Sequence, residues 1–432
     1  MDSINNSSAP KKRLVISSPY SIFILLFLLY MFDYIDRMVI VSLFPFLKLE
    51  WGITDTQCGL LVSAVYWSIL IFTLPVSILI DRWSRIKSIG IMAVLWSVAT
   101  LIGAFTKNFG QLFAVRTAIG LGEAGYAPGG TAMISALFPK EKRAKILGIW
   151  NASIPLGSAL GIALGGIIAD HFGWRHALGI VAIPGLFIAL LFFYARDYET
   201  VALTRFTGDK NNQTELKMRW REIAAHLLGN KTLLFNNLGF AANTFVTTAM
   251  MTWLPSYFQR TEGISMSSAS TKGGAVMLLA IIGAPLGGYL ADKWLKSRRN
   301  ARLLFPSLSS CLTAILLFIA FMFVRGNAQY AVLLAVGVAA VSFVPAAVAV
   351  TQDVVHPGIR AVSLSLCVIV QHILGSSLGP PVIGALSDAF GLETALTFLP
   401  AFALLAGILF FVGSFFYDSD AKPVEKLEAL TK

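Results

Sequence analysis

The sequence predicts an all-α membrane protein with twelve transmembrane helices in two pseudo-symmetric six-helix bundles. Of its 432 residues, 56% are hydrophobic and only 13% are charged, whereas a soluble domain carries about 25% charged residues. The apolar residues are gathered into long segments, and helices are the open-ended structures that lipid permits. The two halves of the chain also repeat each other, which predicts two similar bundles.

Twelve apolar segments follow one another along the chain, each long enough for a bilayer-spanning helix of about 20 residues. They lie near 19–46, 56–80, 87–106, 110–137, 143–170, 175–195, 233–258, 270–292, 302–324, 328–352, 359–388 and 393–417. The longest polar stretch divides them into six plus six. The predicted organisation is therefore a tail (1–18), a bundle (19–195), a linker (196–232), a second bundle (233–417) and a second tail (418–432). Within the linker, 215–228 has the apolar spacing of an amphipathic helix on the membrane surface, although a plain linker fits equally well.

The basic residues set the expected orientation. Of the 34 Lys and Arg, 26 fall on the side of the N-terminus, 6 on the opposite side and 2 within helices, which predicts cytoplasmic termini. The net charge of +11 is thus a topology signal and does not indicate nucleic-acid binding. The polar N-terminus lacks a cleavage site and is interpreted as a cytoplasmic tail, not a signal peptide.

The predicted partners are few. The three cysteines have no metal-binding or disulfide spacing, so we expect no metal and no cofactor. We expect a monomer in a bacterial inner membrane, with lipid, protons and a small-molecule substrate as its partners.

The repeat is clearest at the ends of two segments. Gly166-Ile-Ile-Ala-Asp170 recurs as Gly384-Ala-Leu-Ser-Asp388 at an offset of 218, while Arg143 recurs as Arg360 at an offset of 217. Paired bundles of this kind are typical of alternating access, with the binding site between the halves near the membrane midplane.

Charged residues interrupt the first segment. Asp33, Asp36 and Arg37 stand at i, i+3 and i+4, so they share one helix face with Tyr30. Each such charge costs about 2.5–3.5 kcal/mol at mid-membrane, which indicates a functional site.

The fourth segment adds Arg116 and Glu123, seven residues apart on one face. At 1.5 Å per residue, Asp36 lies about 25 Å and Glu123 about 22 Å from the same membrane side. If the faces meet, pairing leaves one acid free, and a buried free acid can carry a proton. A purely structural set of ion pairs is the competing interpretation, and Asp33 is the acid whose role stays most open.

Further candidates lie elsewhere. The short loops after the second and eighth segments carry charges that either latch the halves together on the cytoplasmic side or only anchor the topology: Asp81, Arg82, Arg85, Asp292 and Lys293. Other polar or aromatic residues on the segments are candidates for lining the substrate pathway: Tyr126, Asn243, Thr247, Gln371 and His372. His372 fits a helix–helix hydrogen bond as well as a ligand.

The chain resembles the major facilitator superfamily in its twelve segments, repeated halves and Asp-Arg loop, although Ser77 and Ser84 stand where that loop motif usually has glycines. Within it, the motifs around Asp36, around Glu123 and at Leu378-Gly379-Pro380-Pro381 resemble the spinster-like branch, and similar patterns occur among organic-anion symporters. The resemblance implies that Asp36, Arg37, Arg116 and Glu123 line a central cavity for proton coupling and substrate binding, and that substrates are lysolipid-like or sphingolipid-like.

The predicted function is proton-coupled secondary transport of a small amphiphilic or anionic organic substrate, with lysolipid-like molecules among the candidates. No enzymatic activity is expected. Asp36 and Glu123, with Asp33, are the predicted proton-coupling residues. The alternatives are an organic-anion/proton symporter, a multidrug or metabolite exporter, and a non-transporting receptor or scaffold. Anionic ligands are expected to compete at Arg37 and Arg116, and cationic ligands at Glu123.

Overall fold

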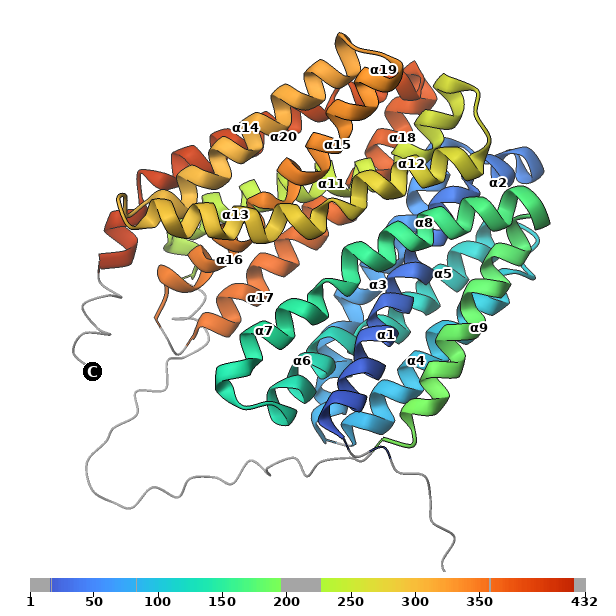
Figure 1. The fold of residues 1–432 in the computed structure, drawn as a ribbon, viewed down its shortest axis with the longest axis horizontal. Coiled ribbons are helices and arrows are strands. Elements are labelled where there is room, and N and C mark those ends of the chain that lie inside the picture. The colour runs from blue at the N-terminus through green and yellow to red at the C-terminus, as the bar shows by residue number, and fades with distance from the viewer. Residues whose placement is uncertain (1–15, 17, 83, 196–226, 357–358, 423–432) are drawn as a thin grey trace, which may run out of the picture.

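The computed structural model describes residues 16, 18–82, 84–195, 227–356 and 359–422. The predicted amphipathic helix at 215–228 therefore lies almost entirely outside the described residues. The protein is an all-helical, multi-pass membrane protein, as predicted, with two bundles side by side (Figure 1).

The first bundle is built from the N-terminal half of the chain. Its elements are α1 (Pro19–Met38), η1 (Val39–Leu43), α2 (Phe44–Trp51), α3 (Asp55–Arg82), α4 (Arg85–Gly103), α5 (Phe109–Glu123), α6 (Tyr126–Leu137), α7 (Lys140–Asn151), α8 (Ser153–Phe172) and α9 (Trp174–Phe192). Short breaks divide the α5–α6 and α7–α8 segments, so each of these spans consists of two helices.

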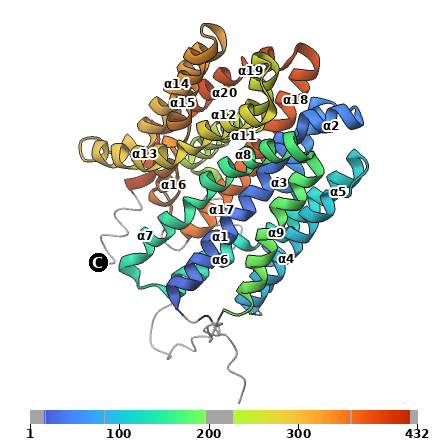
Figure 2. The same ribbon diagram turned by 45° about the vertical axis from the view of Figure 1, so that its right-hand side comes forward.

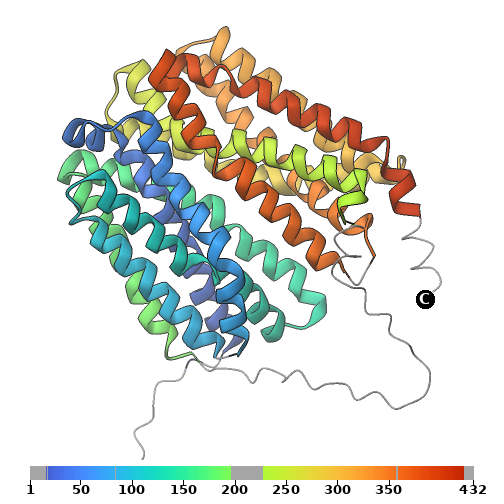
Figure 3. The same ribbon diagram turned by 180° about the vertical axis from the view of Figure 1, so that it is seen from behind.

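The second bundle is built from the C-terminal half and lies beside the first, at the upper right of the reverse view (Figure 3). Its elements are α11 (Lys231–Glu262), α12 (Met266–Leu278), α13 (Ala280–Leu295), α14 (Ala301–Met322), α15 (Gly326–Ser342), α16 (Val344–Asp353), α17 (Arg360–Val370), η3 (Gln371–Ser376), α18 (Gly379–Phe390), α19 (Leu392–Leu396) and α20 (Leu399–Ser414). The segment η3 is a π-helix, which marks an irregularity in the middle of the α17–α18 span.

Nine helical segments of the described residues are long and apolar enough to cross a membrane. The other three predicted segments are α1, α5–α6 and α11. They contain Asp33, Asp36 and Arg37, then Arg116 and Glu123, and finally a polar side of asparagines and threonines. These three segments thus carry most of the candidate site residues.

The bundles approach each other at the end that carries α2 and α18 and diverge toward the end that carries α7 and α17, where the described chain begins and ends (Figures 1 and 2). Where the bundles approach each other, the carboxylate of buried Asp55 in α3 accepts hydrogen bonds from the second bundle. Arg260 of α11 donates to each carboxylate oxygen at 2.7 Å, and the Ser387 hydroxyl of α18 donates at 2.5 Å. Lys48 of the first bundle adds an ion pair with Asp55 at 2.5 Å. We name Lys48, Asp55, Arg260 and Ser387 the clamp.

The repeated aspartates Asp170 and Asp388 make equivalent contacts between the two bundles at this end. Asp388 accepts from the backbone N–H groups of Asp55 and Thr56 at 2.8 and 2.9 Å, and Asp170 accepts from the backbone N–H of Ser267 at 2.6 Å. Each aspartate thus caps the first turn of a helix of the other bundle, where backbone donors are free and negative charge is favoured. The matching glycines allow close approach, since a Cβ on Gly384 would lie 2.5 Å from the Asp55 carbonyl oxygen.

An exposed ion pair between α2 and the first turn of α9 contrasts with the clamp. The Glu50 carboxylate, in α2, accepts a hydrogen bond from each of two guanidinium nitrogens of Arg175, at 2.7 and 2.9 Å. The hydrogen bonds from Arg175, together with one from the Trp174 indole, lower the pKa of the Glu50 carboxyl to about 2. The pair stays charged through the neutral and mildly acidic range, and both partners belong to the first bundle.

Candidate functional site

A buried ion triad occupies the contact between α1 and α5. One guanidinium nitrogen of Arg37 lies 3.1 Å from Asp33 Oδ2 and 2.7 Å from Glu123 Oε2. All three residues are at most 6% exposed. The i, i+4 spacing of Asp33 and Arg37 sets both on one face of α1, and the break after Glu123 ends α5 beside them. We name Asp33, Arg37 and Glu123 the triad.

Arg116 does not join the triad through a carboxylate. Its guanidinium donates to three backbone carbonyl oxygens, those of Leu61 at 3.0 Å, Asp36 at 3.2 Å and Arg37 at 2.9 Å. The last two carbonyls lie near the end of α1, where α-helical hydrogen bonding gives way to η1. Arg116 therefore fixes the turn of the chain that presents Asp36 and Arg37.

Asp36 lies apart from the triad. It is 0% exposed, and neither carboxylate oxygen has a hydrogen-bond partner among the described residues. A buried polar atom without a partner is rare in folded proteins and calls for a proton, a water or an ion. Of the three acids Asp33, Asp36 and Glu123, Asp36 is thus the one without an ion pair among the described residues.

Two tyrosine rings lie beside the Arg37 guanidinium, and one of them contacts a residue of the second bundle. The central carbon of the guanidinium lies 4.5 Å from the ring centre of Tyr34 and 5.6 Å from that of Tyr66. The Tyr66 ring lies 5.7 Å from the ring of His372, a residue of η3. A π-helical turn inside an α-helical span frequently marks a functional site, and this one holds His372 opposite the triad.

The remaining aromatic candidates pack inside the first bundle. Tyr30 stacks on Trp150 with ring centres 4.4 Å apart, and Tyr126 donates from its hydroxyl to the Leu26 carbonyl oxygen at 2.6 Å. Sequence reasoning missed Tyr34, Tyr66 and Trp150. Tyr34 stands within the charged stretch, which was a usable signal, whereas Tyr66 and Trp150 belong to ordinary apolar segments.

The polar candidates of the second bundle have different surroundings. Buried Asn243 donates to the Ser310 hydroxyl at 2.6 Å, between α11 and α14. Gln371 donates to the Cys367 sulfur of its own span at 3.2 Å. Thr247 lines a cavity between the bundles.

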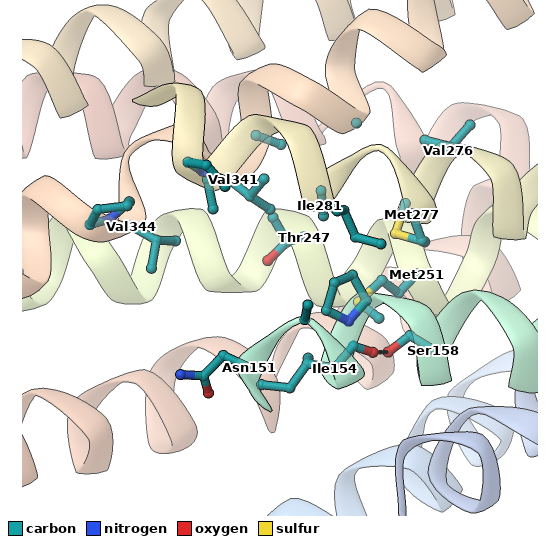
Figure 4. A pocket seen from close by; sticks show the side chains of 18 of the residues that line it. Asn151, Ile154, Ser158, Thr247, Met251, Val276, Met277, Ile281, Val341 and Val344 are labelled. Carbon is teal, nitrogen blue, oxygen red and sulfur yellow. Dashed lines mark hydrogen bonds between the residues drawn. The ribbon is translucent and has the colours of Figure 1, made fainter. Parts of the chain in front are cut away.

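This cavity has a volume of about 710 Å³ and is lined mainly by apolar side chains of α8, α11, α12, α13 and α15. Figure 4 shows Met251, Met277 and Ile281 around it, with Asn151 and Ser158 at its lower side. The Ser158 hydroxyl donates to the Ile154 carbonyl oxygen at 2.8 Å. Asn151 follows Trp150, the residue on which Tyr30 of α1 stacks.

The predicted cytoplasmic latch has one member with a described partner. Asp292 accepts from Arg302 at 3.4 Å, and both residues belong to the second bundle. Lys293 is exposed. The side chains of Asp81, Arg82 and Arg85 lie outside the described residues, so their role as a latch stays a prediction.

Comparison with known proteins identifies the family. Residues 26–374 match the model of the Major Facilitator Superfamily, which covers well over half of the chain. The chain belongs to the major facilitator superfamily. It is therefore a transporter and not an enzyme, as the sequence predicts.

Spinster proteins and a hexuronate transporter are among the relatives of this superfamily member. It is 29% identical to protein spinster of Drosophila melanogaster over 83% of this chain and 60% of that protein, so it spans less than two thirds of the fly protein. It is 27% identical to the sphingosine-1-phosphate transporter SPNS2 of Xenopus tropicalis (92% and 82% covered) and 26% identical to the hexuronate transporter of Bacillus subtilis (90% and 92% covered).

A solved structure has the same fold. It is a bacterial homolog of the human lysosomal transporter spinster in an inward-facing, unoccupied conformation. The TM-score is 0.82, with 21% sequence identity and coverage of 93% of this chain and 98% of that one. The two-bundle architecture predicted from the repeat is thereby confirmed.

Proposed function

We propose that this transporter couples the movement of protons to that of an amphiphilic or anionic organic molecule. The observation that carries the proposal is the separation of two sites in the first bundle. The triad offers a guanidinium to an anionic group, while Asp36 keeps a carboxylate for which the described residues supply no partner. Ionisable residues inside a membrane protein are costly and mark ion or substrate pathways.

The cavity supports an amphiphile over a small sugar acid. A polar head group at Arg37 and an apolar tail along the methionines and valines of the 710 Å³ cavity would use both surfaces. The spinster-like relatives, one of them named as a sphingosine-1-phosphate transporter, point the same way. The hexuronate transporter keeps the organic-anion symporter as the second candidate, because its substrate class would need Arg37 and not the cavity.

The orientation belongs to the same proposal. With both termini in the cytoplasm, as the basic loops favour, the clamp closes the outer end and the bundles diverge toward the inside. The molecule then alternates between this inward-open state and one in which the clamp is broken and the inner loops meet.

Coupling is tested with a fluorescent lysophospholipid in proteoliposomes. Asp36→Asn and Glu123→Gln are each expected to abolish the component of uptake that depends on a pH gradient, because a neutral amide cannot exchange a proton. Glu50→Gln is the matched control, since Glu50 is an acid outside the spans, and it should keep this component. Full gradient-driven uptake in both site variants would contradict the coupling assignment.

The substrate class is tested by thermal unfolding of the purified protein. A ligand at about 100 times its Kd adds about 2.7 kcal/mol to stability, so a lysophospholipid is expected to raise Tm, whereas galacturonate and cationic dyes are not. Met251→Gln should weaken the lysophospholipid effect by making the cavity wall polar. Stabilisation by galacturonate alone, undiminished in Met251→Gln, would favour the organic-anion symporter.

A further inference from the structure

Ser97 of α4 is a buried polar residue near Asp36. The residue is 0% exposed, and its hydroxyl oxygen has no hydrogen-bond partner among the described residues. Thr100, one turn further along α4, also lies beside the Asp36 carboxyl, but its hydroxyl has a backbone partner because it donates to the Trp96 carbonyl oxygen at 3.0 Å. Leaving a buried hydroxyl and a buried carboxylate unsatisfied costs free energy that a single shared ligand would remove.

Gly185 of α9 shows that these two groups border one small space. A Cβ on Gly185 would lie 3.1 Å from Ser97 Oγ, 3.8 Å from Asp36 Oδ2 and 3.6 Å from Phe32 Cβ. The helices α1, α4 and α9 therefore meet around one point inside the first bundle. Even a methyl group on Gly185 would be crowded by the Ser97 hydroxyl, so the point where the three helices meet leaves no room for an organic substrate.

The charges around Asp36 call for one added positive charge. On its own helix, Asp33 and Arg37 belong to the triad, and α5 contributes Glu123 to the triad and Arg116 to the backbone carbonyls. Three carboxylates and two guanidiniums leave one negative charge uncompensated. Toward Asp36, α4 brings the hydroxyls of Ser97 and Thr100, and α9 brings Gly185. Glycines of α8 such as Gly161 pack against the far side of α1.

We propose that Asp36 and Ser97 form a closed ion site between α1, α4 and α9, separate from the substrate side of α1, and that its ion is a proton. A serine hydroxyl can donate to the carboxylate and accept from the protonated carboxyl, so it serves both states. Mg²⁺ and Ca²⁺ take six or more oxygen ligands, whereas the described groups here supply two carboxylate oxygens and the hydroxyls of Ser97 and Thr100. The inference rests on the proposed proton coupling and names a further residue for it.

Arg116 would connect the two sides of α1. It holds the carbonyls of both Asp36 and Arg37, so a shift of the chain at Asp36 on gaining or losing a proton is passed to the triad. Ser97 acts here as a positioning residue for the proton on Asp36, not as a contact for the substrate.

The test is infrared difference spectroscopy of the purified protein between acidic and alkaline buffer, which needs no substrate. We expect a carbonyl-stretch band of a protonated carboxyl that disappears in Asp36→Asn. In Ser97→Ala this band should move to higher frequency because the carboxyl loses a hydrogen bond, and Ser97→Thr should keep the wild-type position. Gly185→Ala, whose Cβ presses on the Ser97 hydroxyl, should also displace the band.

Ser88→Ala is the matched control and should leave the band unchanged. Ser88 is another buried serine of α4 whose hydroxyl has no hydrogen-bond partner within the described parts of the chain. A band that is lost in Asp36→Asn but unmoved in Ser97→Ala would overturn the role of Ser97 and leave proton binding by Asp36 intact. If Asp36→Asn removes no band, proton binding at Asp36 fails, and this site fails with it. Loss of the band on replacing choline chloride by sodium chloride at constant pH would show a metal-cation site and overturn the proposal.

Discussion

Arg37→Met is expected to abolish transport and to lower the free energy of unfolding by about 3–5 kcal/mol, the usual cost of removing one partner from a buried ion pair. The substitution leaves Asp33 and Glu123 at most 4% exposed without the guanidinium that contacts both of them. Thermal unfolding of the purified variant, together with uptake of a fluorescent lysophospholipid, measures the two effects.

The control for this prediction is Arg175→Met. Its exposed pair with Glu50 should contribute less than about 1 kcal/mol. The triple variant Arg37→Met, Asp33→Asn, Glu123→Gln should recover most of the stability, because no buried charge of the triad remains, but it should not recover transport. An Arg37→Met protein as stable as the wild type would show that the triad is not held together by its ion pairs.

Asp55→Ala is expected to shift the protein toward a state that is open at the clamp end. Asp55 receives hydrogen bonds from Arg260 and Ser387 of the other bundle, and its loss leaves those donors without their acceptor. Spin labels at Leu49 of the first bundle and Thr261 of the second, both exposed, report the separation by electron–electron double resonance. The variant should populate a longer distance than the wild type.

Glu393→Ala tests whether any lost charge near this end has the same effect. Glu393 pairs with Arg325 inside the second bundle, so its removal should leave the distance distribution unchanged. If Asp55→Ala and the wild type give the same distribution, the clamp does not hold the bundles together.

Much of the fold and part of the site could be predicted from the sequence. The lengths of the apolar segments and the internal repeat are sufficient to predict two six-helix bundles, because lipid excludes almost every other backbone structure. The depth argument correctly brought α1 and α5 together, and Arg37 contacts Glu123 as expected for facing charges. The functional roles of these residues are not tested by the structure and stay proposals.

The directions of individual side chains could not be predicted. Helical periodicity gives the face on which Arg116 lies but not its rotamer, so its three carbonyl partners were unforeseen. Asp36 and Arg37 are neighbours in sequence, about 100° apart around the helix, and that rotation separates the ion site from the triad. Ser97 and Gly185 carry no sequence signal, since small residues are common in membrane helices. Asp170 and Asp388 were visible as a repeat, but their role as caps required the facing helices.

The π-helix η3 explains an irregularity in the repeat itself. The offset between the halves is 217 at Arg143 and Arg360 but 218 from Gly157 and Gly375 onward, so the second half holds one additional residue between positions 360 and 375. A π-helical turn holds one more residue than an α-helical turn, and the bond from Ser377 N–H to the His372 carbonyl at 3.0 Å spans five residues. The two halves therefore differ by a single-residue insertion that was absorbed within one turn. Its position at His372 means that one bundle has diverged from its twin where it faces Tyr66 and Arg37.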